Sequence, residues 1–228
     1  MRLSSAFTLV LIPLICGSVG AGGEEPENII QNGDFEAQFQ SWLFWTEGGA
    51  VAERQIDSKK VDPIDGRSVA YVKIGNGGGG FNHIQFYQGP FTLKKGKEYT
   101  FCVWGKSDGE PRPVQLRVLH HENPWTNYAM RDVTFNDSWN EYTVTFTQPV
   151  DDNVARVDLF LGTSKVDVWL DHVRLYEGEY FNDEVWELPD QQVDSQGKLA
   201  AAWGAVKTRC RHCKIGNEKH RRDAEDTE

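Results

Sequence analysis

The chain has 228 residues and a formal net charge of −10, and Phe, Trp and Tyr make up 12% of it. The acidic balance argues against a nucleic-acid binder, whose surface would be basic. The length predicts one packed domain of ordinary size with flanking segments. We therefore expect a single core and a partner that is a neutral polymer or a cation.

The first 21 residues have the pattern of a secretory signal peptide. Arg2 precedes the apolar run from Ala6 to Cys16, and small residues follow up to Ala21. A charged start, a short apolar stretch and a small-residue exit are typical of such a leader. The bulky Leu14 and Ile15 argue against lipid attachment at Cys16. No other stretch approaches the ~18 apolar residues of a membrane helix. These features predict a secreted protein, periplasmic or extracellular, without a membrane span.

Residues 28–177 alternate apolar and polar side chains with a period of two. Turn-forming residues such as Gly77–Gly80 and Asp108–Pro111 interrupt the runs, and no segment of ten or more residues has a helical period. The expected strands cover residues 69–74, 84–87, 99–104, 114–119, 142–146, 157–161 and 166–176. This spacing predicts an all-β domain, an antiparallel β-sandwich of jelly-roll, galactose-binding-like type.

Residues 178–228 read as a linker and a charged, mostly disordered tail with one possible short helix at 199–206. Cys210 and Cys213 lie in this tail. A structural zinc site needs four ligands, and a redox site of this spacing needs a βαβ surround. The alternative is a solvated tail with a local disulfide, so the role of the pair stays open. Cys102, in an apolar strand, is expected to be a small buried residue.

Acidic residues stand at both ends of the predicted sandwich. Asp34 and Glu36 follow the first apolar segment, and Asp171 lies between Leu170 and Val173 of the last strand. If these segments lie side by side, their carboxylates can share a calcium ion, which takes oxygen ligands. The expected set is Asp34, Glu36, Ser68 and Asp171: Glu36 and Asp171 supply carboxylates, and backbone carbonyls come from near Asp34 and from the Gly66–Ser68 turn. The alternative is that Asp34 and Glu36 are solvated turn acids and Asp171 caps a strand end.

The segments Asn32–Glu36 and Trp169–Tyr176 resemble the frame of carbohydrate-binding modules of families 4 and 9, the CenC-type domain of secreted polysaccharide-degrading enzymes. The resemblance covers about residues 28–177. It implies a structural calcium site remote from a sugar site, a core position for Trp42, and a structural role for Trp139 at the start of its strand. The chain departs from the pattern at Phe81–His83, where many relatives carry a cleft tryptophan after the glycine-rich turn. That departure argues against ordinary xylan or β-glucan specificity.

A sugar site requires an aromatic ring for the C–H face of a pyranose and planar polar groups for its hydroxyls. The strand alternation turns His83, Gln85 and Arg117 outward, and Trp125 and Tyr128 lie in or beside a loop. The candidate contacts are Trp125, Tyr128, Gln85, Arg117, His83 and Asp158. The alternative is that Trp125 and Tyr128 are packing residues that cover the open end of the sandwich. The polar residues would then be ordinary surface residues on the solvent-facing side of a sheet, without a role in binding.

The sequence does not suggest a catalytic pair. Glycosidases place two carboxylates ~5–9.5 Å apart across the scissile bond, and no spaced pair of acids stands out here. We therefore predict a secreted, non-catalytic protein that binds a polysaccharide or oligosaccharide. Two alternatives remain: an accessory module or fragment of a glycoside hydrolase, and an extracellular protein-recognition scaffold, since one fold carries many functions.

Overall fold

The computed structural model describes residues 26–57 and 59–183. The predicted signal peptide, the possible helix at 199–206 and the pair Cys210 and Cys213 lie outside these residues. Within the described part, no helix is long and apolar enough to cross a membrane.

The described residues form ten strands and one short 3₁₀ helix, η1 (Phe81–His83), with every strand pair antiparallel. The strands are β1 (Leu43–Thr46), β2 (Val51–Asp57), β3 (Val69–Asn76), β4 (Ile84–Leu93), β5 (Glu98–Ser107), β6 (Arg112–His120), β7 (Asn127–Phe135), β8 (Asn140–Thr147), β9 (Asp152–Phe160) and β10 (Val168–Glu177). The all-β prediction is confirmed.

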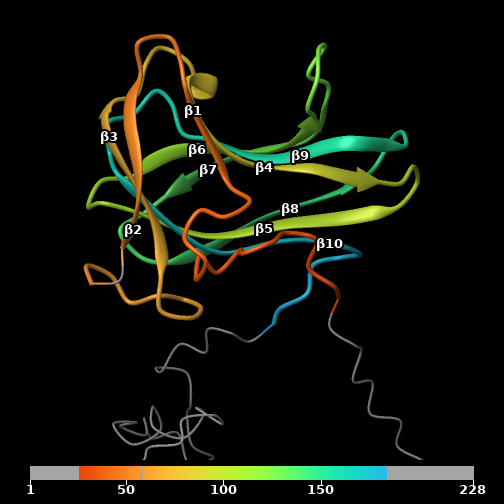
Figure 1. Cartoon of the computed structure of the whole chain (residues 1–228), viewed down its shortest axis with the longest axis horizontal. Coiled ribbons are helices and arrows are strands. Elements are labelled where there is room, and N and C mark those ends of the chain that lie inside the picture. The colour runs from red at the N-terminus through yellow and green to blue at the C-terminus, as the bar shows by residue number, and fades with distance from the viewer. Residues whose placement is uncertain (1–25, 58, 184–228) are drawn as a thin grey trace, which may run out of the picture. The chain divides into compact units, whose positions relative to one another are not determined.

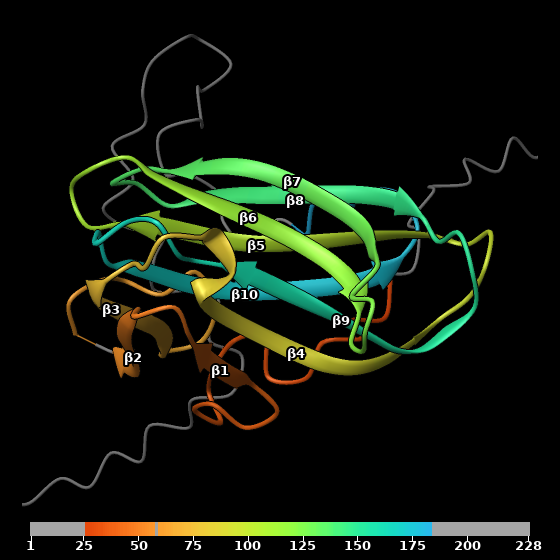
Figure 2. The ribbon, with the colours of Figure 1, turned by 90° about the horizontal axis from the view of Figure 1, so that it is seen from above.

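Two five-stranded sheets lie face to face (Figures 1 and 2). The first sheet has the order β1-β4-β9-β6-β7, and the second has the order β2-β3-β10-β5-β8. Neighbours in each sheet are mostly distant in sequence, so the chain crosses repeatedly between the layers. The predicted jelly-roll sandwich is therefore the observed architecture.

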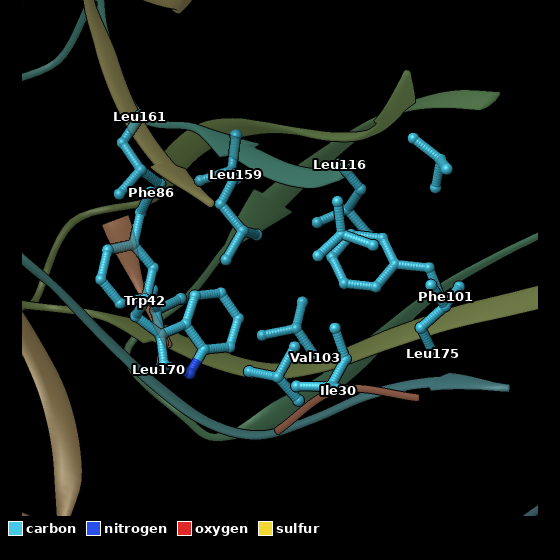
Figure 3. Packing of buried hydrophobic residues seen from close by; sticks show 14 of the residues in the cluster. Ile30, Trp42, Phe86, Phe101, Val103, Leu116, Leu159, Leu161, Leu170 and Leu175 are labelled. Carbon is cyan, nitrogen blue, oxygen red and sulfur yellow. The ribbon is translucent and has the colours of Figure 1, made fainter. Parts of the chain in front are cut away.

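The core fills the space between the two inner faces (Figure 3). Leu116 and Leu159 project from the first sheet, and Val103 and Leu170 project from the second. Burying each such side chain contributes roughly 1.5–3 kcal/mol relative to leaving it exposed. One continuous core therefore holds both sheets together, as the sequence predicted.

Trp42 occupies one end of this core, as expected. Its indole stacks on the ring of Phe86 with centroids 4.9 Å apart and an interplanar angle of 2°, and its Nε1 donates to the carbonyl of Asn32 at 2.9 Å. Trp139 packs against a smaller buried cluster that contains Tyr71 and Trp169. Both tryptophans are structural, and the buried indole N–H of Trp42 has a partner, which avoids the cost of an unsatisfied donor.

Three observed strands were not predicted: β1, β2 and β7. All three lie at sheet edges, because β1 and β2 end one side and β7 ends the first sheet on the other. An edge strand buries few side chains, so its sequence lacks a strong apolar alternation, as in the Glu53–Gln55 run of β2. The fourth edge strand, β8, was predicted because Tyr142, Val144 and Phe146 keep the apolar alternation.

The compact unit extends beyond the expected boundary at residue 177 and ends at Asp183. The backbone N–H of Phe181 donates to the hydroxyl of Tyr176 at 2.8 Å, and the hydroxyl of Tyr180 donates to Glu141 at 2.6 Å. Asp183 forms an ion pair of 2.8 Å with Arg174. Through these contacts, residues 180–183 pack against β8 and β10.

Replacing Trp42 with alanine should lower the free energy of unfolding by about 3–5 kcal/mol, the usual cost of truncating a buried aromatic residue. Trp45, three residues later and 55% exposed, provides the matched control. Its alanine variant should stay within about 0.5 kcal/mol of the wild type. Urea unfolding measures both. Equal losses in the two variants would contradict this account of the core.

Candidate functional site

A cleft of about 530 Å³ opens on the outer face of the first sheet, on the side away from the core. The β6–β7 loop stands out from this sheet, and η1 lies near its other end (Figure 1). The lining residues are Trp45, Glu47, Asn82, Gln85, Tyr87, Arg117, Leu119, His121, Trp125, Asn127, Arg156 and Phe160. They come from five strands, two loops and η1, so the folded sheet assembles the cleft.

Strand alternation explains why these side chains reach the cleft. On β4, Ile84 and Phe86 are fully buried in the core, so Gln85 and Tyr87 face the other way. The same alternation on β6 turns Arg117 outward. The register places Gln85 beside Phe160 of β9. Gln85, Arg117 and Trp125 therefore line one cleft.

The floor of the cleft is a network of planar polar side chains. Arg156 Nη2 donates to Gln85 Oε1 at 2.8 Å, and Arg117 Nη1 donates to Asn127 Oδ1 at 2.7 Å. Arg117 Nη2 also donates to Gln115 Oε1 at 2.8 Å. Amide and guanidinium groups fixed in this way present oriented donors and acceptors with little rotamer freedom left to lose.

Two exposed indoles border this floor. Trp125 is 49% exposed and Trp45 is 55% exposed, although both line the cleft. Trp125 lies in the β6–β7 loop with a φ of 58°, and the guanidinium of Arg156 lies 5.4 Å from the centre of its ring. A large aromatic side chain that stays exposed to water beside a concave polar site is typical of a ligand-binding surface. Such rings offer a flat apolar surface to a ligand.

Trp45 was not among the predicted site residues. Phe44 packs against the core, so its neighbours Leu43 and Trp45 face outward. The alternation of residues 42–45 indicates that Trp45 faces outward. That indication holds only if the segment is a strand, which the short β1 at the sheet edge does not reveal from sequence. The pairing of Trp45 with Gln85 then places the indole at the cleft.

Two predicted contacts lie outside the cleft. Tyr128 packs against the core, and its hydroxyl donates to Asp152 at 2.8 Å. His83 belongs to η1 rather than to β4, and its Nδ1 accepts a hydrogen bond from the backbone N–H of Gly79 at 3.0 Å. His83 lies in η1 just before β4, so the strand alternation that turns Gln85 outward does not extend to it. Neither residue lines the site.

Asp158 faces the outer side of β9, as predicted, but it is fully buried. Arg156 Nη2 lies 2.8 Å from Asp158 Oδ2, and neither carboxylate oxygen accepts a well-directed hydrogen bond from a described residue. Burial raises the pKa of Asp158 well above its usual value, and the nearby Arg156 and Arg117 oppose this shift. Asp158 therefore supports the arginines from below and does not reach the cleft surface.

The acids of the expected metal site all contact backbone N–H groups. Asp171 Oδ2 accepts from Ile64 at 2.7 Å and Asp65 at 3.1 Å, and Glu36 Oε1 accepts from Arg67 at 2.6 Å. Asp34 Oδ1 accepts locally from the N–H of Glu36 at 3.3 Å. Both Glu36 and Asp171 thus approach one segment, residues 64–67, which ends beside the half-buried Ser68.

Carboxylate oxygens are ligands that a hard cation prefers, and those of Glu36 and Asp171 both approach residues 64–67. Burial raises the pKa of Asp171 to about 7, so a cation nearby would favour its ionised form. No group of three or more His, Cys, Asp or Glu residues in the described part of the chain is placed to hold a metal. An ion here would rely on two carboxylates and on backbone carbonyl oxygens.

Comparisons with known proteins agree with the fold. A family model described as a carbohydrate binding domain matches residues 27–166. A solved structure of a CBM4 module is 29% identical, with 65% of this chain and 99% of that chain covered and a TM-score of 0.56. No curated protein matches the chain.

Two more distant structures share the fold alone. The enzymatically active domain of tailspike protein 4 from bacteriophage CBA120 is 13% identical, with a TM-score of 0.54 over 66% of this chain and 21% of that chain. The tandem CBM22 domain of Paenibacillus barcinonensis Xyn10C is 10% identical, with a TM-score of 0.51 over 70% of this chain and 48% of that chain.

The Asp158→Asn variant should change how stability depends on pH. Because the folded-state pKa of Asp158 is raised, its contribution to stability is complete below the ordinary value of 3.8 and is lost as pH rises through the folded pKa. The wild type should therefore lose free energy of unfolding relative to the variant as pH rises above about 4. Urea unfolding at several pH values measures this difference. Parallel profiles would contradict it.

Proposed function

Because the chain belongs to the family of carbohydrate-binding modules 4 and 9, we propose that it is a secreted, non-catalytic protein that binds a polysaccharide or oligosaccharide in this cleft. The signal-peptide pattern of residues 1–21 supports the location. The observation that carries the proposed site is the pair of exposed tryptophans beside an ordered polar floor.

The cleft provides both surfaces that a sugar chain requires. Trp45 and Trp125 offer flat rings for the C–H faces of pyranoses, while Gln85 and Arg117 offer planar groups for vicinal hydroxyls. Gln85 is held by its own hydrogen bond from Nε2 to the carbonyl of Asn82 at 2.9 Å. Binding residues that are already ordered lose less entropy when a ligand arrives.

Glycoside hydrolysis is less well supported than binding. The reaction needs two carboxylates that flank the bond. Among the residues that line the cleft, Glu47 is the one with a carboxylate. Asp158 lies buried under the arginines and cannot act from the opposite side. A reducing-sugar assay on the purified protein tests this alternative, and a glycan array run beside a pull-down tests the protein-scaffold alternative.

The Trp125→Ala and Trp45→Ala variants should each weaken binding to a recognised glycan by about tenfold or more. Loss of a stacked aromatic residue at a hot spot commonly costs ~1–3 kcal/mol, and about 1.4 kcal/mol corresponds to tenfold in affinity. Both rings are half exposed, so the melting temperature should change little. Isothermal titration calorimetry and thermal melts separate the two effects.

The Tyr128→Phe variant provides the control, because it removes only a hydroxyl outside the cleft. Its glycan affinity should equal that of the wild type. A Trp125→Ala protein that loses stability but keeps its affinity would show that Trp125 packs the loop and that the binding site lies elsewhere.

We also propose a structural calcium ion between Glu36 and Asp171. The support is that both carboxylates reach residues 64–67, and that Asp171 is fully buried without a cationic side chain bonded to it among the described residues. The ion would join the start of the domain to its last strand and neutralise the buried charge. It would lie away from the cleft residues.

Calcium should therefore stabilise the folded chain. At a free concentration of 100 times Kd, binding to the folded state alone adds about 2.7 kcal/mol. Thermal melts with calcium and with a chelator measure the effect, and Glu36→Gln should reduce it. Glu53→Gln, an exposed acid on β2, is the matched control. Identical melts of the wild type in calcium and chelator would refute the proposal.

A further inference from the structure

The charge of the cleft differs in sign from that of the whole protein. Arg117 and Arg156 both line it, and Glu47 is the one acid among the lining residues. Glu47 stands exposed and accepts a hydrogen bond from Asn82 at 2.7 Å. Burial lowers the pKa of the histidine that lines it, His121, which favours its neutral form. A chain of formal charge −10 thus holds a net positive cleft.

Two aromatic rings and a carboxylate surround the guanidinium of Arg156. The group lies 4.4 Å from the ring centre of Tyr87 and 5.4 Å from that of Trp125, and the side chain is only 6% exposed. One nitrogen, Nη2, contacts Gln85 and Asp158, but the buried Nε has no hydrogen-bond partner among the described residues. An unsatisfied buried N–H is costly.

Arg117 repeats this arrangement on the neighbouring strand. Its guanidinium lies 4.7 Å from the ring centre of Phe160, and its buried Nε also has no hydrogen-bond partner in the described part of the chain. Asp158 lies beneath both arginines and provides at most one negative charge for two cations. Glu47 also lines the cleft, and Asp132 acts on Arg117. Because burial favours the neutral form of Asp158, the acid directly beneath the two guanidinium groups compensates their charge only in part, which is unfavourable in a partly desolvated site.

We propose that the cleft recognises an acidic sugar, whose anionic substituent binds Arg156 and Arg117 while its ring stacks on Trp45 or Trp125. This inference rests on the proposed carbohydrate-binding function and narrows its ligand class. Guanidinium groups bind carboxylates and sulfates through two parallel hydrogen bonds, whereas a neutral sugar leaves the charge unpaired. A uronate carboxylate and a sulfate ester share this chemistry, and separate ligands distinguish them.

The test is calorimetry of the intact chain with three sets of oligosaccharides: galacturonate oligomers, sulfated galactan oligomers and neutral cello- and xylo-oligomers. At low salt, at least one acidic set should bind about tenfold or more tightly than the neutral set. Raising the salt from about 20 to 500 mM should reduce this preference, because screening weakens interactions between charges. The better acidic set identifies carboxylate or sulfate as the recognised group.

Two variants assign the preference to the cleft. Arg156→Gln and Arg117→Gln should each reduce acidic-sugar affinity about tenfold and leave a smaller salt dependence, while binding to the neutral set changes less. Arg131→Gln is the matched control, because Arg131 is exposed on β7, bonds to the carbonyl of Thr143 and does not line the cleft. If Arg156→Gln does not fold, Arg117→Gln and the salt series still test whether the cleft arginines cause the preference for acidic sugars.

The outcomes separate this inference from the proposed function. Equal affinity for neutral and acidic sugars, sensitive to Trp125→Ala, would overturn the acidic preference and leave carbohydrate binding in place. Acidic binding that neither arginine variant reduces would overturn the assignment to these residues. No measurable binding to any of the three sets, on a glycan array as well, would remove the support for both.

Discussion

The alternation of side chains along β4, β9 and β6 is the constraint on which both the core and the cleft depend. Successive residues of a strand face opposite sides, so a single register assigns Phe86 and Leu159 to the core and Gln85 and Arg156 to the cleft. A shift of one residue would exchange the two sets and bury charged groups between the sheets. The stability of the core therefore also fixes the geometry of the binding face.

The outer face carries an energetic cost that the core offsets. Arg156 is almost fully removed from water, and its partners Gln85 and Asp158 do not satisfy every donor. A buried ion pair seldom stabilises a fold as much as well-packed apolar side chains would. At a ligand site, such an arrangement holds the binding groups in a fixed geometry before the ligand arrives, at the expense of folding stability.

The start of the domain is fixed by contact with β10. The backbone N–H of Ile29 donates to Leu175 at 2.7 Å, and the N–H of Val173 donates to Gly33 at 3.0 Å. A Cβ atom on Gly33 would lie 2.1 Å from the carbonyl oxygen of Val173, so only glycine permits this approach. The Asn-Gly-Asp segment near the start of the domain and the bulge of β10 near Asp171 thus meet, whether or not an ion joins them.

The sequence alone determined the fold class, because the period-two pattern and turn residues of the central strands are strong signals of a buried sandwich. It also predicted that Gln85, Arg117 and Trp125 face outward, and these three line one cleft, since alternation and a loop position do not depend on distant partners. Tertiary structure decided the rest. Edge strand β1 brings Trp45 to the cleft, strand pairing buries Asp158 beneath the arginines, and η1 removes His83 from the site. These outcomes depend on which strands become neighbours, and local sequence does not encode that choice on its own.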